Sequence, residues 1–350
     1  MVAVGLAGEP WTDPLGVVRR LGAVQSQDFL PAKWSIASRC AGIDDAAMDR
    51  LFDEGRIIRT HVLRPTWHFV LPGELQWLLG LTAPRVHQMS RYYYRQQELD
   101  DATLAACGYV IERLLDGGAF LTRSEIAAGL AVSGIVAAGP RMGLIMMWAE
   151  LEGMVCSGPR RGRQHTYASM GSRIEGGERL DPDEALAALT RRYFAGHGPA
   201  SRKDFRWWSS LTLATIDRGL EMVAGDLVSE TVDGVEYWWD GSATETPGDG
   251  LAARLLPGYD EYIVGYSETK WELDRSGTAR RSSGRNVTFN QVVLMDSQVV
   301  GQWRPRMEGG RLLIEVDVYR PLEDGEREAL GREAVRYGTF AGREAEMTFL

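Results

Sequence analysis

Two glutamines and an aspartate stand close together near the start of the chain, in the stretch Gln25-Ser26-Gln27-Asp28. An amide can hold a water molecule by hydrogen bonds, whereas a carboxylate can also act as a base. On a continuous helix the two glutamines would point about 200° apart, because each residue turns about 100°. In an extended segment they share a face. The two amides therefore act together only if the preceding helix has ended; the alternative is that they bind backbone groups of a turn.

The elements expected around this stretch are three helices and a β-hairpin. Asp13 and Pro14 suit the cap and first residue of a helix, and Gly55 suits the end of a later one. Arg64-Pro65 separates two segments rich in β-branched and aromatic residues, a pattern typical of a hairpin. In chain order the expected elements are helices over 14–24, 32–41 and 44–55 and strands over 57–63 and 66–71.

Two later segments each contain the order helix, helix, two strands. The first begins with the capping box Thr122-Arg-Ser-Glu125 and the second with the similar Ser201-Arg-Lys-Asp204. Asp233-Gly234 is favoured in tight hairpin turns and joins the last two strands. This order is typical of winged helix-turn-helix modules, and the interval between the capping boxes suits tandem duplication.

The sequence thus predicts an α+β fold of three tandem winged helix-turn-helix modules with a C-terminal β-rich element. The expected domains are 1–100, which carries the Gln-x-Gln stretch, then 101–178 and 179–250, and the β-rich element over 251–350. The last region has strand-like runs, a late helix and no glycine-rich phosphate signature.

The charge of the chain is unevenly distributed. The formal net charge of −9 opposes a uniformly basic nucleic-acid-binding surface. Locally basic stretches nevertheless occur in the expected wing of the second module and in a later loop, where they could reach a phosphate backbone or could simply be solvated. The arginines concerned are Arg160, Arg161 and Arg163 in the wing and Arg275, Arg280, Arg281 and Arg285 in the loop.

The composition favours a globular protein of the cytoplasm. Hydrophobic residues make up 44% and charged residues 25% of the 350 residues, as in ordinary globular proteins. The three cysteines, Cys40, Cys107 and Cys156, are widely spaced, so neither a disulfide framework nor a zinc site is expected. The sequence has no basic leader and no run of 18 apolar residues, so neither secretion nor membrane spanning is expected.

Several motifs in this order resemble a known family. They are the Gln-x-Gln-Asp stretch, the hairpin Arg59-Thr-His61-Val-Leu-Arg64-Pro-Thr-Trp67-His68, Leu-Leu-Pro-Gly-Tyr-Asp260 and Val-Val-Gly301-Gln-Trp303. Together they resemble the winged-helix DNA-binding proteins that include AlkZ-type and YcaQ-type bacterial DNA glycosylases. The resemblance covers nearly the whole chain, and the two glutamines match the AlkZ type, since the YcaQ type has an aspartate in second place.

The resemblance implies a C-shaped monomer that encloses duplex DNA bearing alkylated purines and needs no metal or cofactor. It implies hydrolysis of the N-glycosidic bond of N7-alkylated purines, and in some members the unhooking of interstrand crosslinks as self-resistance. Gln25 and Gln27 would be catalytic, with Asp28 as a second candidate base. Ser26 departs from the family, in which the spacer is usually aliphatic or small.

Within this resemblance, the hairpin supplies the expected DNA contacts Arg59, His61, Arg64, Trp67 and His68. Arginine beside a polar motif is costly to bury unpaired, which favours a phosphate contact. The two histidines could face one groove, or one of them could be structural. Trp67, like Trp34, could stack on a nucleobase or sugar.

Two other functions remain compatible with the sequence. A transcription regulator would be a symmetric dimer that reads a palindromic site, but no dimerisation helix is evident. A protein-interaction scaffold would have lost DNA binding, in keeping with the net charge. Binding to short duplexes that weakens steeply with salt would exclude the scaffold.

Overall fold

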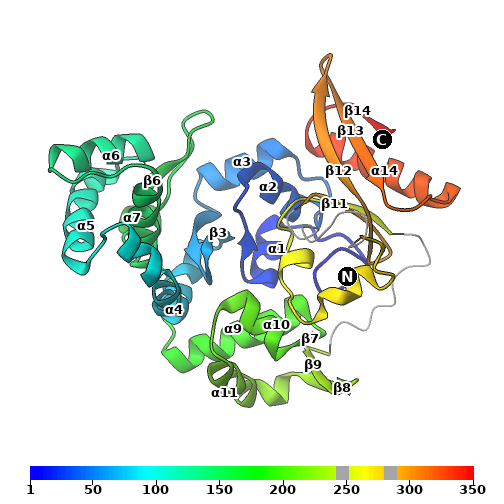
Figure 1. The fold of residues 1–350 in the computed structure, drawn as a ribbon, viewed down its shortest axis with the longest axis horizontal. Helices are drawn as coiled ribbons and strands as arrows, with labels where there is room; N and C mark the ends of the chain where they lie inside the picture. The colour runs from blue at the N-terminus through cyan, green and yellow to red at the C-terminus, as the bar shows by residue number, and fades with distance from the viewer. Residues whose placement is uncertain (242–251, 280–289) are drawn as a thin grey trace. The chain divides into compact units, whose positions relative to one another are not determined.

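The computed structural model describes residues 1–241, 252–279 and 290–350 and shows a mixed α+β protein (Figure 1). The chain divides into two compact units. Unit 1 comprises 1–48, 190–208 and the described parts of 212–350, and unit 2 comprises 49–189 and 209–211. Arg280, Arg281 and Arg285 lie outside the described residues.

One order of elements occurs three times along the chain: helix, short strand, helix, helix and two strands. The first repeat is α1 (Pro14–Leu21), β1 (Val24–Gln25), α2 (Phe29–Ala37), α3 (Asp45–Asp53), β2 (Ile58–Val62) and β3 (Arg64–Val70). The second is α5 (Asp101–Leu115), β4 (Leu121–Thr122), α6 (Arg123–Val132), α7 (Gly139–Leu151), β5 (Val155–Ser157) and β6 (Thr166–Ser169). The third is α9 (Pro182–His197), β7 (Ala200–Ser201), α10 (Arg202–Ser209), α11 (Leu213–Val223), β8 (Val228–Val232) and β9 (Val235–Trp239).

The second and third repeats form sheets of the same topology. In each, the short first strand pairs antiparallel with the last strand, which gives the orders β4-β6-β5 and β7-β9-β8. Both predicted caps are present: Thr122 and Glu125 form a capping box, and Asp204 accepts the backbone N–H of Ser201 at 3.1 Å. The sequence predicted these elements because their caps and turns are local.

The first repeat differs from the prediction at two helix boundaries. The helix expected to reach Val24 ends at Leu21, because Gly22 adopts a left-handed conformation with φ of 78°. The next helix starts at Phe29 rather than Ala32, so Pro31 lies in the first turn, where its missing N–H costs nothing.

The longest helix of the described chain, α4 (Leu75–Gln96), has no counterpart in the sequence prediction. The 3-10 turn η1 (Pro72–Glu74) leads into it, and α4 belongs to unit 2. Its polar second half and the internal Pro84 weaken the helical pattern, although the first half buries an apolar stripe of Leu75, Leu78 and Leu79.

A five-stranded sheet dominates the C-terminal part of unit 1, in the order β10-β11-β12-β13-β14 (Figure 1). Its first four strands pair antiparallel, and β14 pairs parallel with β13. The strands are β10 (Ala253–Leu256), β11 (Val292–Met295), β12 (Gln298–Glu308), β13 (Arg311–Val318) and β14 (Ala345–Phe349). The remaining described helical segments are α8 (Met170–Arg173), α12 (Glu261–Val264), α14 (Asp324–Phe340), η2 (Asp116–Gly118), η3 (Ala224–Asp226) and η4 (Thr269–Asp274).

The segment after β10 corrects a sequence expectation. The run from Pro257 to Tyr266 was expected to be strand-like, but it turns and forms α12. Asp260 starts this helix by accepting the backbone N–H of Tyr262 at 2.9 Å. A helix cap therefore outweighs the β propensity of the following residues.

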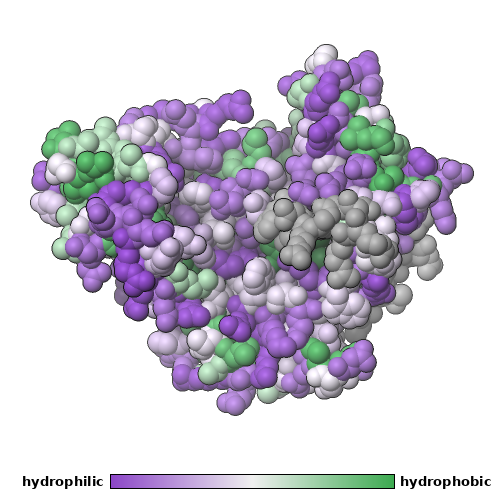
Figure 2. All heavy atoms as spheres, viewed as in Figure 1, coloured by the Kyte–Doolittle hydropathy of each residue, from purple (hydrophilic) through white to green (hydrophobic). Residues whose placement is uncertain are grey.

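Buried side chains include all three cysteines, which are free thiols. Trp34, considered above as a stacking residue, is also buried at 2% exposure and packs against Tyr337 and Phe340 of α14. On the face shown in Figure 2, hydrophilic residues predominate and hydrophobic ones form separate groups. Among the described residues, no helix is long and apolar enough to cross a membrane.

Candidate active site and nucleic-acid interface

The Gln-x-Gln stretch lies between two helices of unit 1, with Gln25 in a short strand and Gln27 in the bend that follows it. Gly22 reverses the chain after α1; a Cβ there would lie 3.1 Å from the Arg192 side chain and 3.3 Å from that of Trp208. Gln25 follows in β1, and its side chain is largely buried, whereas Gln27 is half-buried. The helix thus ends before Gln25, so the two glutamines do not point apart as they would on a continuous helix, although the strand itself ends at Gln25 and Gln27 lies in a bend.

The backbone of Gln25 is bound by a glutamate that is distant in sequence. The N–H of Gln25 donates to Oε1 of Glu261 at 2.7 Å. The other oxygen, Oε2, accepts Trp208 Nε1–H at 3.0 Å and lies 3.4 Å from His197 Nε2. All three side chains are buried. Sequence reasoning missed Glu261, although it directly follows the Asp260 motif that supported the resemblance.

Asp260 itself forms a buried ion pair with Arg39. The guanidinium binds both carboxylate oxygens, at 2.9 and 2.8 Å, and Ser35 donates a third hydrogen bond at 2.6 Å. Burial opposes ionisation of Asp260, but the charge and hydrogen bonds of Arg39, together with the hydrogen bonds from Ser35 and the Tyr262 backbone, outweigh it and lower the pKa of Asp260. This pair connects the segment just after α2 to the residue that caps α12, directly beside the glutamate that binds Gln25.

Asp28 is exposed and occupies the residue before α2 without making a capping hydrogen bond. It lines a cavity of about 430 Å³ in unit 1. Carboxylates of Glu315 and Asp317, the amide of Gln302 and the guanidinium of Arg304 line the same cavity, and Arg304 pairs with Glu315. Gln302 belongs to the Gly301-Gln-Trp303 motif, but nothing in the sequence indicated that Glu315 and Asp317 of β13 would line the same cavity.

The hairpin of unit 2 separates the predicted DNA-contacting residues onto two faces. His61 lies opposite Trp67 and Thr60 opposite His68 in the register of β2 and β3. Because neighbours along a strand point to opposite faces, His61 and His68 do not face one groove. This corrects the expectation that the two histidines could act from the same side.

His61 and Trp67 converge on Glu150 of α7. Nδ1 of His61 contacts one carboxylate oxygen, and Trp67 Nε1–H donates to the other at 3.4 Å. His61 and Glu150 are buried, whereas Trp67 is half-buried. The guanidinium of Arg59 lies 4.3 Å from the centre of the Trp67 ring, in a cation–π contact.

A hollow of about 650 Å³ in unit 2 is lined by Arg59 and Trp67. Residues of the second repeat complete its wall, among them Arg123, Gln164, His165 and Tyr167. Arg123 also lies over the Trp67 ring, 5.8 Å from its centre. Burial, together with the charges of Arg59 and Arg160, lowers the pKa of His165 to about 4. Sequence reasoning missed Arg123 and His165, because only the fold brings α6 and β6 to the hairpin.

His68 and Arg64 contact each other on the other side of the hairpin. His68 is fully buried, and its Nδ1 lies 3.0 Å from the carbonyl of Thr66 while Nε2 lies 3.4 Å from the Arg64 guanidinium. Burial and the charge of Arg64 hold the pKa of His68 well below its usual range. The neutral ring therefore donates from Nδ1 and accepts at Nε2, which orients Arg64.

The predicted basic loops are only partly free to attract phosphate. Arg160 pairs with Asp49 at 2.6 Å and with Asp53 at 3.6 Å, and Arg161 pairs with Glu125 at 2.7 Å. Arg163 is exposed and forms no ion pair with any described residue. Arg275 is exposed and pairs with Glu272 at 2.5 Å. The wing is therefore less cationic than its sequence, since acidic residues elsewhere in the fold neutralise it.

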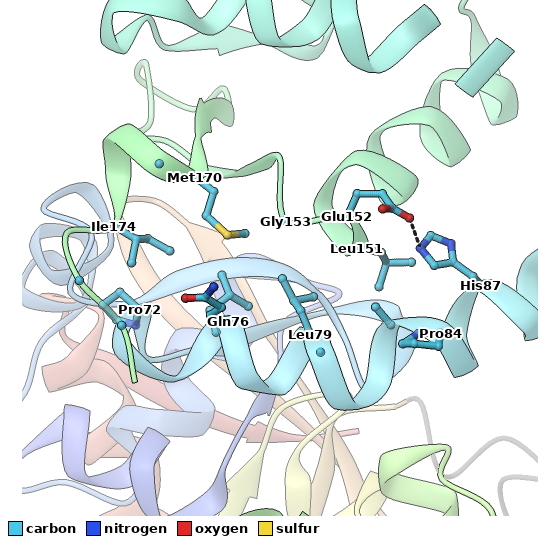
Figure 3. Close-up of a pocket in the computed structure, with 16 residues that line it drawn as sticks. Pro72, Gln76, Leu79, Pro84, His87, Leu151, Glu152, Gly153, Met170 and Ile174 are labelled. Atoms are coloured by element: carbon cyan, nitrogen blue, oxygen red, sulfur yellow. Dashed lines mark ion pairs between the residues drawn. The ribbon is translucent and has the colours of Figure 1, made fainter. Parts of the chain in front are cut away.

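A further cavity of unit 2, of about 530 Å³, lies between α4 and the segment after β6 (Figure 3). Leu75, Leu79 and Met170 give it an apolar wall, and His87 and Glu152 form an ion pair of 3.1 Å at one end. None of the predicted site residues lines this cavity. In the part of the chain that the structure describes, no group of histidine, cysteine and acidic side chains could hold a metal ion.

Comparisons with known proteins place the chain among the DNA glycosylases. Residues 18–340 match the family model described as DNA glycosylase AlkZ-like. The chain therefore belongs to the AlkZ-like DNA glycosylase family, whose members hydrolyse N-glycosyl bonds in DNA, and the regulator and scaffold alternatives are not favoured.

A curated protein and a solved structure, both from Streptomyces sahachiroi, are similar to the chain over almost its full length. One is an interstrand DNA cross-link repair glycosylase from Streptomyces sahachiroi, 27% identical, with 95% of this chain and 93% of that protein covered. The other is the solved structure of the Streptomyces sahachiroi DNA glycosylase AlkZ. It matches with a TM-score of 0.83 and 23% identity, and covers 100% of this chain and 97% of that one. The structural match confirms the mixed α+β fold.

Proposed function

We propose that this glycosylase removes cationic, N7-alkylated purines from duplex DNA, with Gln25 and Gln27 as its catalytic residues. The observation that supports this role is the end of α1 at Leu21, which leaves Gln25 in extended backbone and Gln27 two residues further on. Asp28 is a second candidate base, since its carboxylate is exposed and not used as a helix cap.

The chemistry of a cationic purine suits an amide pair. Alkylation at N7 places positive charge on the base, which then leaves as a neutral molecule without a general acid. The enzyme must hold a water molecule and stabilise the oxocarbenium-like sugar through oriented dipoles. Carboxamide oxygens can do both weakly, which suffices only for a bond that is already labile. We therefore expect little excision of neutral bases such as uracil or hypoxanthine.

The decisive experiment measures abasic sites in a duplex that contains N7-methylguanine. Wild type should release the base, and Gln27→Ala and Gln25→Ala should each slow single-turnover excision by about 100-fold, in the range of a lost transition-state hydrogen-bonding group. Gln96→Ala is the matched control, because Gln96 is an exposed glutamine of α4. Uracil excised as fast as N7-methylguanine would refute the amide mechanism.

We propose that Arg59 and Trp67 lead the contacts with DNA, from the hollow that they line. The exposed Arg163 adds a phosphate contact, with Arg275, Arg280, Arg281 and Arg285 as further predicted ones. His61 and His68 act mainly by orienting Trp67 and Arg64, since both imidazoles are buried. The paired Arg160 and Arg161 contribute to binding only where a phosphate replaces their carboxylate partners.

We also propose that the three repeats are winged-helix modules, as their common element order and the two matching sheets support. The four-domain division and the C-shaped enclosure of DNA stay predictions from the sequence. The monomeric state can be tested by light scattering. The three free thiols favour a location in the cytoplasm.

Interstrand crosslinks are a second substrate class in this proposal. The support is the cross-link repair for which the relative from Streptomyces sahachiroi is named, since that protein is similar over nearly the whole chain. A duplex crosslinked through two N7 positions should separate into single strands on a denaturing gel after incubation with the enzyme. Excision of N7-methylguanine without separation would restrict the activity to monoadducts.

A further inference from the structure

We infer that Glu261 is a positioning residue for catalysis, because its carboxylate binds the backbone amide of Gln25. This inference rests on the proposed catalytic role of Gln25. The contact is a charge-assisted hydrogen bond of 2.7 Å between Gln25 N–H and Glu261 Oε1, and both residues are buried. Hydrogen bonds to an ionised acceptor are shorter and stronger than those between neutral groups.

The Gln25 segment needs an anchor of this kind. It follows Gly22, whose left-handed conformation ends α1, and β1 has only two residues. Such a short strand has few ladder hydrogen bonds with which to set its orientation. Since the side chain of Gln25 leaves the backbone one bond from the bound N–H, fixing that N–H restricts where the amide can point.

The carboxylate of Glu261 is itself held from several directions. Trp208 Nε1–H donates to Oε2 at 3.0 Å, and Nε2 of His197 lies 3.4 Å from the same oxygen. The His197 ring stacks on Tyr193, with centres 4.7 Å apart and an angle of 12° between the planes. Tyr266 O–H donates to the carbonyl of His197 at 2.8 Å. These contacts fix Glu261 in one place.

Gly265 packs closely against the His197 ring and so helps to hold the residues around Glu261 in place. A Cβ on Gly265 would lie 2.9 Å from the His197 ring. The end of α12 can therefore pack against His197 only because residue 265 has no side chain. Tyr193 O–H also donates to the carbonyl of Gly265 at 3.1 Å. A buried carboxylate is costly unless hydrogen-bonded, and the donors Gln25 N–H and Trp208 Nε1–H, together with the His197 contact, offset that cost.

The isosteric variant Glu261→Gln tests the inference. Gln25 N–H and Trp208 Nε1–H both donate, so an amide cannot accept at both of its ends. We expect single-turnover excision of N7-methylguanine to fall roughly tenfold to a hundredfold, as for a displaced catalytic group. The dissociation constant for the same duplex should stay within about twofold, because positioning acts after binding.

A second readout needs no activity. With ¹⁵N-glutamine labelling, the Gln25 backbone amide, assigned by its loss in Gln25→Ala, should resonate far downfield in wild type and move upfield in Glu261→Gln, because the charged acceptor is gone. If wild type excises no base, the proposed function fails, while this resonance still tests the contact.

Glu333→Gln is the matched control, since Glu333 is a buried glutamate of unit 1 on α14 and pairs with Arg336. It should leave both the excision rate and the Gln25 resonance unchanged. An unchanged rate or an unchanged resonance in Glu261→Gln would overturn the inference. Should Glu261→Gln fail to fold, Glu261→Asp keeps the charge but shortens the side chain, and the same two outcomes apply.

Discussion

Two buried glutamates, one in each unit, are bound by the same types of side chain. In unit 1, Glu261 is contacted by His197 and by the indole N–H of Trp208. In unit 2, Glu150 is contacted by His61 and by the indole N–H of Trp67. We call these the Glu261 cluster and the Glu150 cluster.

The two clusters differ in what their tryptophan faces. Trp208 is fully buried, so the Glu261 cluster is closed to solvent. The carboxylate oxygen of Glu261 that does not bind Trp208 accepts the backbone N–H of Gln25. Trp67 is half-buried and lines an open hollow with Arg59, so the Glu150 cluster holds an aromatic ring at the hollow that we propose contacts DNA. One set of residue types can thus fix a main chain or orient an exposed ring, depending on burial. Loss of a partner should accordingly affect stability and catalysis in unit 1 and DNA binding in unit 2.

The largest effect is expected beside the sealed cluster. Asp260→Ala leaves the guanidinium of Arg39 buried without its carboxylate, which should lower the free energy of unfolding by about 3–5 kcal/mol. Urea denaturation followed by circular dichroism measures this change. Asp217→Ala removes an exposed pair with Arg202 and should cost less than about 1 kcal/mol. Equal losses in the two variants would contradict the importance of burial here.

The next effect separates the two clusters by function. Glu150→Gln leaves one donor without an acceptor, so Trp67 should lose its fixed orientation and duplex binding should weaken about tenfold, within the range for base–aromatic stacking. Excision from DNA that is already bound should change little. This is the opposite of the pattern expected for Glu261→Gln, and fluorescence anisotropy with single-turnover assays distinguishes them. A shared pattern would mean that both clusters serve only folding.

His165 should make the open hollow sensitive to acid. Its folded pKa of about 4 lies below the usual 6.5, so the unfolded chain binds the proton first as pH falls. The stability that the neutral His165 ring contributes is present above pH 6.5 and is lost progressively as the pH falls to about 4. Because the ring is only half-buried, we expect about 1 kcal/mol rather than the full value of the shift.

Urea denaturation at pH 7 and pH 4.5 measures that contribution as the difference between wild type and His165→Gln. The variant should lose less stability on acidification than wild type does. Arg59→Met should raise the pKa of His165 in an NMR titration, since one of the two nearby positive charges is removed. A pKa of His165 near 6.5 in wild type would show that the hollow is more hydrated than its geometry indicates.

The smallest effect concerns the wing arginines. Arg163→Ala should reduce the slope of log affinity against log salt by about 0.9, because one phosphate contact is lost. Arg160→Ala should change the slope less and should instead lower stability slightly, since Arg160 is bound to Asp49 and Asp53. Equal changes in slope would mean that DNA displaces these carboxylates.

The sequence predicted the repeated elements well because their signals are local. Capping residues such as Thr122 and Ser201 and the Asp233-Gly234 turn each act within a few positions. For Gln25, the sequence indicated that extended backbone is required but did not predict where the helix ends. That end depends on the left-handed Gly22, and a glycine in a helical pattern does not by itself mark the end of a helix.

The residues that hold the site in place, such as Glu261 and Glu150, could not be predicted from the sequence, because they come from distant segments. Glu261 reaches Gln25 and Glu150 reaches His61, and no spacing in the chain indicates either contact. The same limit explains the wing: the run around Arg160 contains no acid, but its counter-charges come from α3. Local charge counts therefore overestimated the potential of this loop.

The buried thiols bear on the survival of the enzyme itself. An alkylating agent attacks a thiolate far more readily than a thiol. Burial raises the pKa of Cys40 to about 11 and that of Cys156 to about 12, and it also raises the pKa of Cys107. In the folded protein all three are protonated and shielded. If the substrate is alkylated DNA, as we propose, the alkylating reagent would find few reactive thiols in the folded enzyme.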